Sequence, residues 1–137
     1  MLGLLVLGAA VASAKPGTPP PDVKGTTYEP PPAWASAQGG DGWLAYGSFC
    51  WQTACVDFVP PSRRTDVPKL RAQAGVTIGI HLRFVPKSVR VRVLDTGRSY
   101  SLVAARDTHW RVRGSGPIVV EARGAAGSAS YVARIVR

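Results

Sequence analysis

Residues 47–59 read GSFCWQTACVDFV and contain both cysteines of the chain, Cys50 and Cys55. Four residues separate the cysteines, and aromatic or β-branched residues flank them on each side, which is typical of a β-hairpin. We therefore predict a hairpin closed across its turn by a Cys50–Cys55 disulfide. A ring this small adds about 2 kcal/mol of stability, so it fixes a hairpin but does not replace a hydrophobic core.

The first 14 residues form an apolar run that is too short to span a bilayer, which needs about 20 residues. The run ends in Ala12-Ser13-Ala14, the small-residue pattern of a signal-peptidase site. We predict a signal peptide cleaved after Ala14, so that the protein is secreted or lies in the cell envelope, where disulfides persist. No basic residue precedes the run, which indicates a weak leader or a start codon upstream of Met1. A buried N-terminal helix is the alternative.

Residues 15–42 have the composition of a linker, with proline clusters at 19–21 and 30–32. Such clusters favour extended chain that does not pair inside a sheet. Trp34 lies in this segment and is the aromatic residue least expected in a core. The folded domain is predicted to span residues 43–137.

Beyond Pro68 the chain alternates apolar and polar residues between Gly- or Pro-rich turns, and no segment keeps helical spacing. The apolar positions share one face of each predicted strand: Val76, Ile78, Ile80, Leu82 and Phe84; Val89, Val91 and Val93; Ile118, Val120 and Ala122; Tyr131, Ala133 and Ile135. Seven or eight short strands of this kind predict an all-β fold, an immunoglobulin-like antiparallel β-sandwich. A small β-barrel is the alternative.

The chain carries a formal charge of +9. Residues 15–59 hold two basic and four acidic groups, whereas residues 60–137 hold fifteen basic and four acidic groups. This field would attract anionic polymers. Arg90, Arg92 and Arg111 lie on the polar phase of their strands and are candidate binding residues, although a solvated strand face has the same pattern.

Sequence motifs for catalysis are absent: there is no nucleophile elbow, phosphate-binding glycine loop or HExxH. Two thiols supply half of a zinc site, and His81 and His109 lack a paired-ligand spacing, so we predict no metal and no cofactor. We predict that the protein is not an enzyme. Convergence of either histidine with an acid and a hydroxyl in one cleft would instead favour a hydrolase.

Aromatic residues crowd around the cysteines, and two interpretations of Trp51 remain open. A tryptophan beside a disulfide often fills the core of a sandwich. Alternatively, Trp51 lies exposed at the turn with Gln52 and Thr53 and binds a carbohydrate or a peptide. Alternation places Phe49 and Trp51 on one face and Cys50 on the other.

The GSFCW…CVD stretch, together with Gly127 and the closing run Tyr131-Val132-Ala133-Arg134-Ile135, resembles a set of uncharacterised bacterial exported proteins and putative lipoproteins. The resemblance covers about residues 43–136. It implies a small β-sandwich with a disulfide hairpin and implies no activity. This chain lacks the lipobox cysteine, so lipid anchoring does not carry over.

We therefore predict a non-catalytic exported or envelope domain that binds an envelope protein or an anionic cell-wall polymer. An inhibitor or ligand-binding module that uses the Cys50–Cys55 turn is the second hypothesis, and an enzyme whose site the sequence does not display is the third. Nucleic acid is not an expected partner, because the basic strands lack interleaved aromatics. No transmembrane segment is predicted, and the sequence does not define an oligomeric state.

Overall fold

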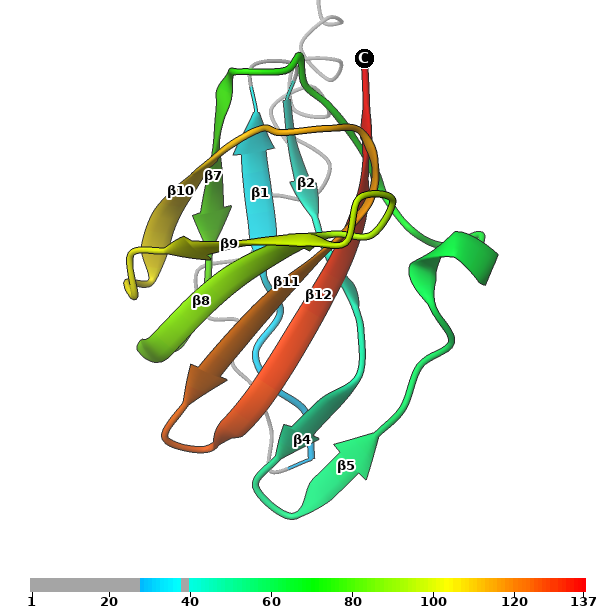
Figure 1. Cartoon of the computed structure of the whole chain (residues 1–137). Helices are drawn as coiled ribbons and strands as arrows, with labels where there is room; N and C mark the ends of the chain where they lie inside the picture. The colour runs from blue at the N-terminus through cyan, green and yellow to red at the C-terminus, as the bar shows by residue number, and fades with distance from the viewer. Residues whose placement is uncertain (1–27, 38–39) are drawn as a thin grey trace, which may run out of the picture.

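The computed structural model describes residues 28–37 and 40–137, and these fold into two β-sheets (Figure 1). The predicted signal peptide and residues 15–27 of the predicted linker lie outside the described residues. The small sheet contains, in spatial order, β10 (Asp107–Arg111), β7 (Thr77–His81), β1 (Trp34–Ala37) and β2 (Gly40–Trp43). The large sheet contains, in spatial order, β5 (Ala54–Val56), β4 (Phe49–Trp51), β12 (Gly127–Val136), β11 (Gly116–Gly124), β8 (Pro86–Val93) and β9 (Arg98–Leu102). Both β3 (Ala45–Tyr46) and β6 (Lys69–Arg71) also pair with β12, and a 3-10 turn, η1 (Pro61–Arg63), precedes β6.

One hydrophobic core joins the inner faces of the two sheets. Ile78 and Ile80 of the small sheet are fully buried and belong to the same cluster as Val91 and Ile118 of the large sheet. This packing confirms the predicted all-β sandwich. Within residues 28–37 and 40–137, paired strands run antiparallel, except β6 and β12, which run parallel.

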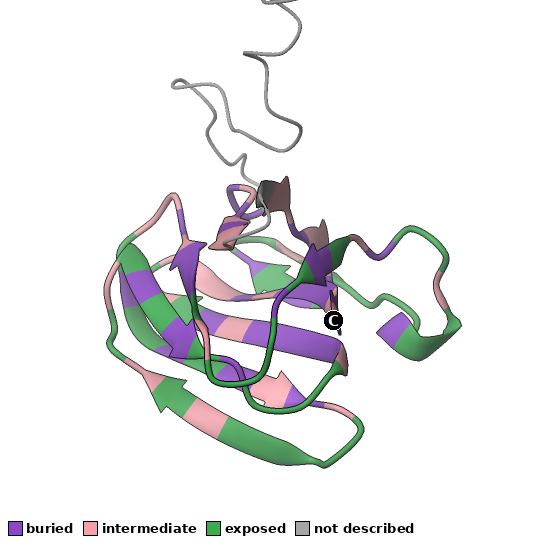
Figure 2. Cartoon of the chain, turned by 90° about the horizontal axis from the view of Figure 1, so that it is seen from above, coloured by how far each residue is buried: buried purple, intermediate pink, exposed green. Residues whose placement is uncertain are grey.

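The predicted alternation of apolar and polar residues is confirmed in the long strands. Val89, Val91 and Val93 of β8 are at most 3% exposed, whereas Arg90 lies exposed between them. Figure 2 shows this alternation of buried and exposed positions along the strands. A pleated strand turns successive side chains to opposite faces, so burial of the valines directs the arginines to solvent.

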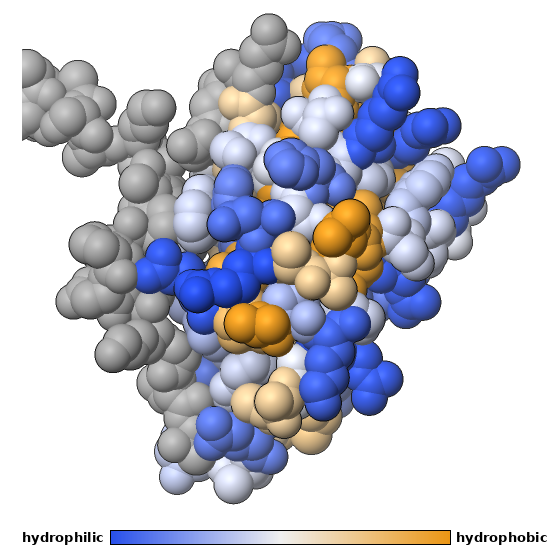
Figure 3. Space-filling model, turned by 90° about the vertical axis from the view of Figure 1, so that its left-hand side faces the viewer, coloured by the Kyte–Doolittle hydropathy of each residue, from blue (hydrophilic) through white to orange (hydrophobic). Residues whose placement is uncertain are grey.

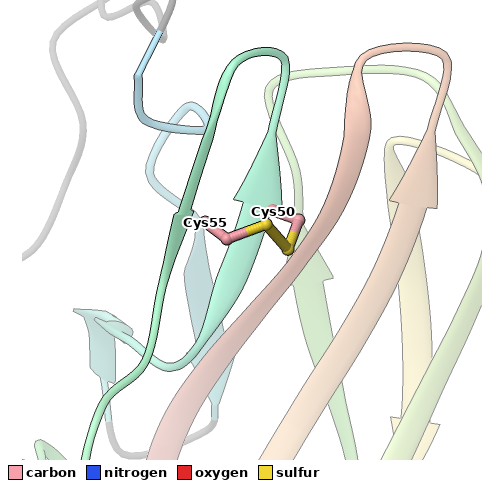
Figure 4. Close-up of a disulfide and its surroundings, with 2 residues drawn as sticks. All are labelled: Cys50 and Cys55. Carbon is pink, nitrogen blue, oxygen red and sulfur yellow. A yellow bond between two sulfur atoms is a disulfide. The ribbon is translucent and has the colours of Figure 1, made fainter.

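The β4–β5 hairpin has the predicted disulfide (Figure 4). The Cys50 and Cys55 sulfurs are 2.04 Å apart, and the two residues are direct partners in the register of the hairpin. Phe49 and Trp51 are each 5% exposed, and both cysteines are exposed. The hairpin therefore buries its aromatic face and turns its disulfide away from the core.

Strand β1 lies within the segment that the composition predicts as a linker. It pairs on one side with β2 and on the other with β7, so it is a central strand of the small sheet. Ala35 within the strand and Ala33 just before it are fully buried. Alanines after a proline cluster carry little strand signal, because strand propensity comes mainly from β-branched and aromatic residues.

Two tyrosine hydroxyls fasten the proline cluster that precedes β1. Tyr46 Oη donates to the Pro30 carbonyl over 2.6 Å, and Tyr131 Oη donates to the Pro31 carbonyl over 2.7 Å. Burial, with a smaller contribution from the charge of Glu29, raises the pKa of Tyr46 to about 12. Burial also raises the pKa of Tyr131. Both phenols therefore stay protonated in the folded chain at a pH where they ionise in the unfolded chain.

We predict that stability falls as the pH rises above about 10, the ordinary pKa of tyrosine. The unfolded chain then loses protons that the folded chain keeps, and this lowers the free energy of unfolding up to the folded pKa of about 12 for Tyr46. The Tyr46→Phe variant should lose about 1 kcal/mol at pH 7 from its missing hydrogen bond. Its urea midpoint should then fall less than that of the wild type between pH 9 and 11. Equal falls in the two proteins would contradict this explanation.

Candidate functional site

A groove of about 850 Å³ lies between the outer face of the large sheet and the segment that follows β5. We call this segment, residues 57–67, the strap. In Figure 1 it leaves β5, stands away from the sheet around η1 and then rejoins it. Phe58, Val59, Pro60 and Pro61 line the strap side of the groove.

The groove floor has an excess of positive charge. Arg90 donates to Glu121 Oε1 through Nη2 over 2.7 Å and through Nε over 3.0 Å, and Arg92 Nη2 lies 3.5 Å from Glu121 Oε2. Arg123 also lines the groove and has no acidic partner among residues 28–37 and 40–137. Three arginines and one glutamate give the lining a formal charge of +2. Because Arg90 and Arg92 are each about half exposed, their guanidinium groups remain open to an anion.

Hydroxyl groups and apolar side chains complete the lining. The hydroxyls come from serines on the sheet and on the loop before β4: Ser48, Ser88, Ser101, Ser128 and Ser130. Phe58 and Val59 are 38% and 53% exposed at the edge of the strap. The groove therefore offers cations, hydroxyls and an apolar wall to a ligand that lies along the sheet.

Arg64 fixes the strap to the sandwich. Its Nη1 donates to the Tyr46 carbonyl over 2.6 Å, while Nε and Nη2 each donate to one Asp66 carboxylate oxygen over 2.8 Å. The guanidinium also lies over the Phe58 ring, 5.0 Å from its centroid. The hydrogen bonds from Arg64 lower the pKa of Asp66.

A small apolar cluster and a serine fix the two ends of the strap. Val67 packs with Val119 and Val132 on the outer face of the large sheet. At the other end, the Phe58 amide donates to Ser48 Oγ over 3.0 Å. The strap is therefore anchored at both ends and at Arg64, and these contacts hold it beside the groove.

The residues predicted at the hairpin turn lie outside this groove. Trp51 packs in the core with its ring 5.0 Å from that of Phe84, so it fills the core and is not an exposed anchor. Gln52 and Thr53 are exposed, and Gln52 has a left-handed backbone, with φ of 48°. Of the predicted binding residues, only Arg90 and Arg92 come together in the groove.

Arg111 lies in a second hollow, of about 700 Å³, where β9 and β10 approach each other. Arg98 and Arg113 line it as well, so its formal charge is +3. Figure 3 shows that one side of the molecule is covered largely by hydrophilic side chains with small apolar patches between them. Cationic groups are thus spread over the surface beyond the groove.

A chain of hydrogen bonds that no local sequence pattern indicates crosses the outer face of the small sheet. Ser36 Oγ lies 2.8 Å from His81 Nε2, and His81 Nδ1 lies 2.8 Å from Asp107 Oδ1. The three residues come from β1, β7 and β10, which are neighbours in space but far apart in sequence. The alternation of apolar and polar residues predicts that His81 faces outward. Which residues it contacts depends on strand order and register. Neither of the two hollows described above includes Ser36 or His81.

No protein-family model, curated protein or solved structure matches this chain. Within residues 28–37 and 40–137, no group of three or more histidine, cysteine, aspartate or glutamate side chains is placed to hold a metal ion. The same residues include no helix with the length and apolar character of a membrane span. The family resemblance and the export of the protein stay predictions.

We predict that Arg64→Gln loosens the strap, because glutamine cannot form the two-pronged contact with Asp66 and reach the Tyr46 carbonyl together. Loss of the part-buried, charge-assisted hydrogen bond to the Tyr46 carbonyl costs about 1.5–3 kcal/mol, so exchange of the Phe58 amide should become at least about ten-fold faster. Measured by NMR, the pKa of Asp66 should rise towards its ordinary value of about 3.9.

The neighbouring Arg63→Gln variant is the matched control, since Arg63 is exposed and has no acidic partner in the described part of the chain. Its strap should exchange like that of the wild type. If both variants changed amide exchange equally, Arg64 would not be the anchor.

Proposed function

We propose that the protein is exported and binds an anionic cell-wall polymer in the groove beneath the strap. The observation that carries this proposal is the uncompensated charge of the floor, where Arg90 and Arg92 share one carboxylate and Arg123 has no acidic partner in the part of the chain that the structure describes. Arginine forms two-pronged hydrogen bonds with carboxylates and phosphates. The signal-peptide pattern and the exposed disulfide support an oxidising location outside the cytoplasm.

The form of the groove supports an extended ligand. Its floor crosses four strands, from β12 through β11 and β8 to β9, and serine hydroxyls lie on the first and the last of them. A polymer with regularly spaced acidic groups and hydroxyls would contact both the arginines and the serines. The groove lining includes no histidine, so we assign binding rather than chemistry to it.

Two alternative functions have less support: an inhibitor that uses the disulfide turn, and a domain that binds a protein in the groove. An inhibitor that uses the Cys50–Cys55 turn would need an exposed anchor there, and Trp51 is buried. Aromatic anchors dominate protein interfaces. A protein partner in the groove would have to rely on apolar side chains such as Phe58 and Val59, which are 38% and 53% exposed.

We predict that Arg90→Gln, Arg92→Gln and Arg123→Gln together weaken sedimentation of the oxidised protein with purified bacterial cell wall. Loss of charge-assisted hydrogen bonds of about 1.5–3 kcal/mol each should lower the affinity by at least about ten-fold. Binding by the wild type should weaken as sodium chloride rises from about 0.05 to 0.5 M, because salt screens exposed charges.

The matched control removes three positive charges outside the groove, with Lys69→Gln, Lys87→Gln and Arg106→Gln. These side chains are exposed and line neither hollow. The control should keep most of the affinity. If it binds as weakly as the groove variant, net charge alone drives retention, and if neither change matters, the groove does not hold the polymer.

A further inference from the structure

We propose that Ser36 is a nucleophile activated by His81 and Asp107, and that the outer face of the small sheet hydrolyses short-chain esters. This proposal does not rest on the groove, which lies on the other sheet and shares no residue with this site. It assigns a reaction to a hydrogen-bonded arrangement of three side chains.

The direction of the two hydrogen bonds gives Ser36 a general base. An ionised carboxylate only accepts hydrogen bonds, so the 2.8 Å contact between His81 Nδ1 and Asp107 Oδ1 places a proton on Nδ1. Nε2 of the neutral ring is then an acceptor, and the Ser36 hydroxyl donates to it over 2.8 Å. A serine, an imidazole and a carboxylate in this sequence of hydrogen bonds can carry out nucleophilic acyl transfer on unrelated folds.

Paired strands and a stacked ring hold the imidazole in place. The register sets His81 opposite Trp34 on one side and opposite Asp107 on the other. The Trp34 ring stacks on the imidazole, with centroids 4.5 Å apart and an angle of 21° between the planes. The His81 side chain is 21% exposed, so it is supported on one face and still accessible. A catalytic base needs this combination of fixed orientation and access.

Gly79 provides the space that the contact between Ser36 and His81 needs. A Cβ at position 79 would lie 2.5 Å from Ser36 Oγ and 2.8 Å from His81 Nε2, closer than side chains tolerate. Ser36 and His109 are both register partners of Gly79, one on each side. Gly79 is buried, and the Ser36 hydroxyl and the His81 imidazole fill the place where a side chain at position 79 would lie.

Since Ser36 and His81 themselves cover Gly79, an ester carbonyl would approach the Ser36 hydroxyl from the solvent side of the Ser36–His81 contact. Ser36 and His81 lie outside both hollows, so neither hollow can hold the acyl chain of a substrate that binds there. We therefore expect substrates with short acyl groups. Acetyl esters presented on a larger molecule fit this site.

The reaction needs only water as a co-reactant. Ser36 Oγ bonds to the carbonyl carbon while its proton passes to His81 Nε2. The bond between that carbon and the alcohol oxygen breaks, and the alcohol leaves with the proton, which gives an acyl-Ser36 ester. A water molecule then gives a proton to Nε2 and attacks the ester. Return of the proton to Oγ releases the carboxylic acid and regenerates Ser36.

The test uses the oxidised full chain, a fluorophosphonate that modifies activated serines, and p-nitrophenyl acetate. We expect one adduct, located at Ser36 by peptide mass spectrometry, and release of p-nitrophenol above the buffer rate. General bases contribute about 10²–10⁴-fold to such rates. His81→Gln should therefore lower the rate of Ser36 labelling and the rate of ester hydrolysis by at least about 100-fold. Asp107→Asn should lower both rates by at least about ten-fold.

Two further variants separate chemistry from folding. Gly79→Ala keeps all three residues but places a methyl group against both Ser36 Oγ and His81 Nε2, so it should remove the reactivity while the urea midpoint stays near that of the wild type. Ser36→Cys should react with iodoacetamide faster in the presence of His81 than with His81→Gln. Both outcomes require an activated side chain at position 36.

The exposed Ser99 and Ser101, on the large sheet, are the internal controls. The proposal is overturned if Ser36 is labelled no faster than these serines, or if labelling and ester hydrolysis are unchanged by His81→Gln. In that case the hydrogen-bond chain only ties β1, β7 and β10 together. The substitutions of Arg90, Arg92 and Arg123 act on the other sheet. Even if they weaken wall binding, we expect ester hydrolysis to be unchanged.

Discussion

Burial of one face of each strand is the constraint on which this protein depends. In a pleated strand, a register slip of one residue would exchange the core-facing and solvent-facing side chains. Ile78 and Ile80 must face the core, and this fixes Gly79 and His81 on the outer face of the small sheet. In the same way, Val89 and Val91 direct Arg90 to the outer face of the large sheet. Both sites thus owe their composition to residues that touch neither ligand nor substrate.

The outer faces of the two sheets carry different side chains. The large sheet carries arginines and serines and is partly covered by a strap that Arg64 anchors. The small sheet carries Trp34, His81 and Asp107 in one cross-strand row, and Gly79 beside this row leaves room for the contact between Ser36 and His81. One face is therefore suited to holding a charged chain, and the other to positioning a reacting group.

Much of the fold was predictable from local patterns, because the long strands alternate β-branched and charged residues. The disulfide pairing followed from there being two cysteines, and the burial of Phe49 and Trp51 on a common face followed from their spacing. Strand β1 was hidden because its core positions are alanines behind a run of prolines, and its anchors, Tyr46 and Tyr131, lie later in the sequence.

The candidate sites were harder to predict because they depend on non-local order. The spatial order β10-β7-β1 brings residues 36, 81 and 107 together, and no periodicity within one segment encodes that order. Likewise, Arg90 and Arg92 were recognisable as outward residues, but the groove requires the strap, whose position depends on the contacts of Arg64 and Val67. Sequence patterns indicated which side chains face solvent, and the pairing of distant strands determined which of them meet.

The outward disulfide has a consequence for how the protein responds to its surroundings. Cys50 and Cys55 are exposed, and the ring they close lies at the margin of the large sheet, on the opposite side of the hairpin from Phe49 and Trp51. A small thiol reagent can reach the sulfurs without first opening the interior. Reduction would remove the covalent link across the β4–β5 hairpin, whereas the backbone pairing of the two strands and the burial of Phe49 and Trp51 do not involve the sulfurs.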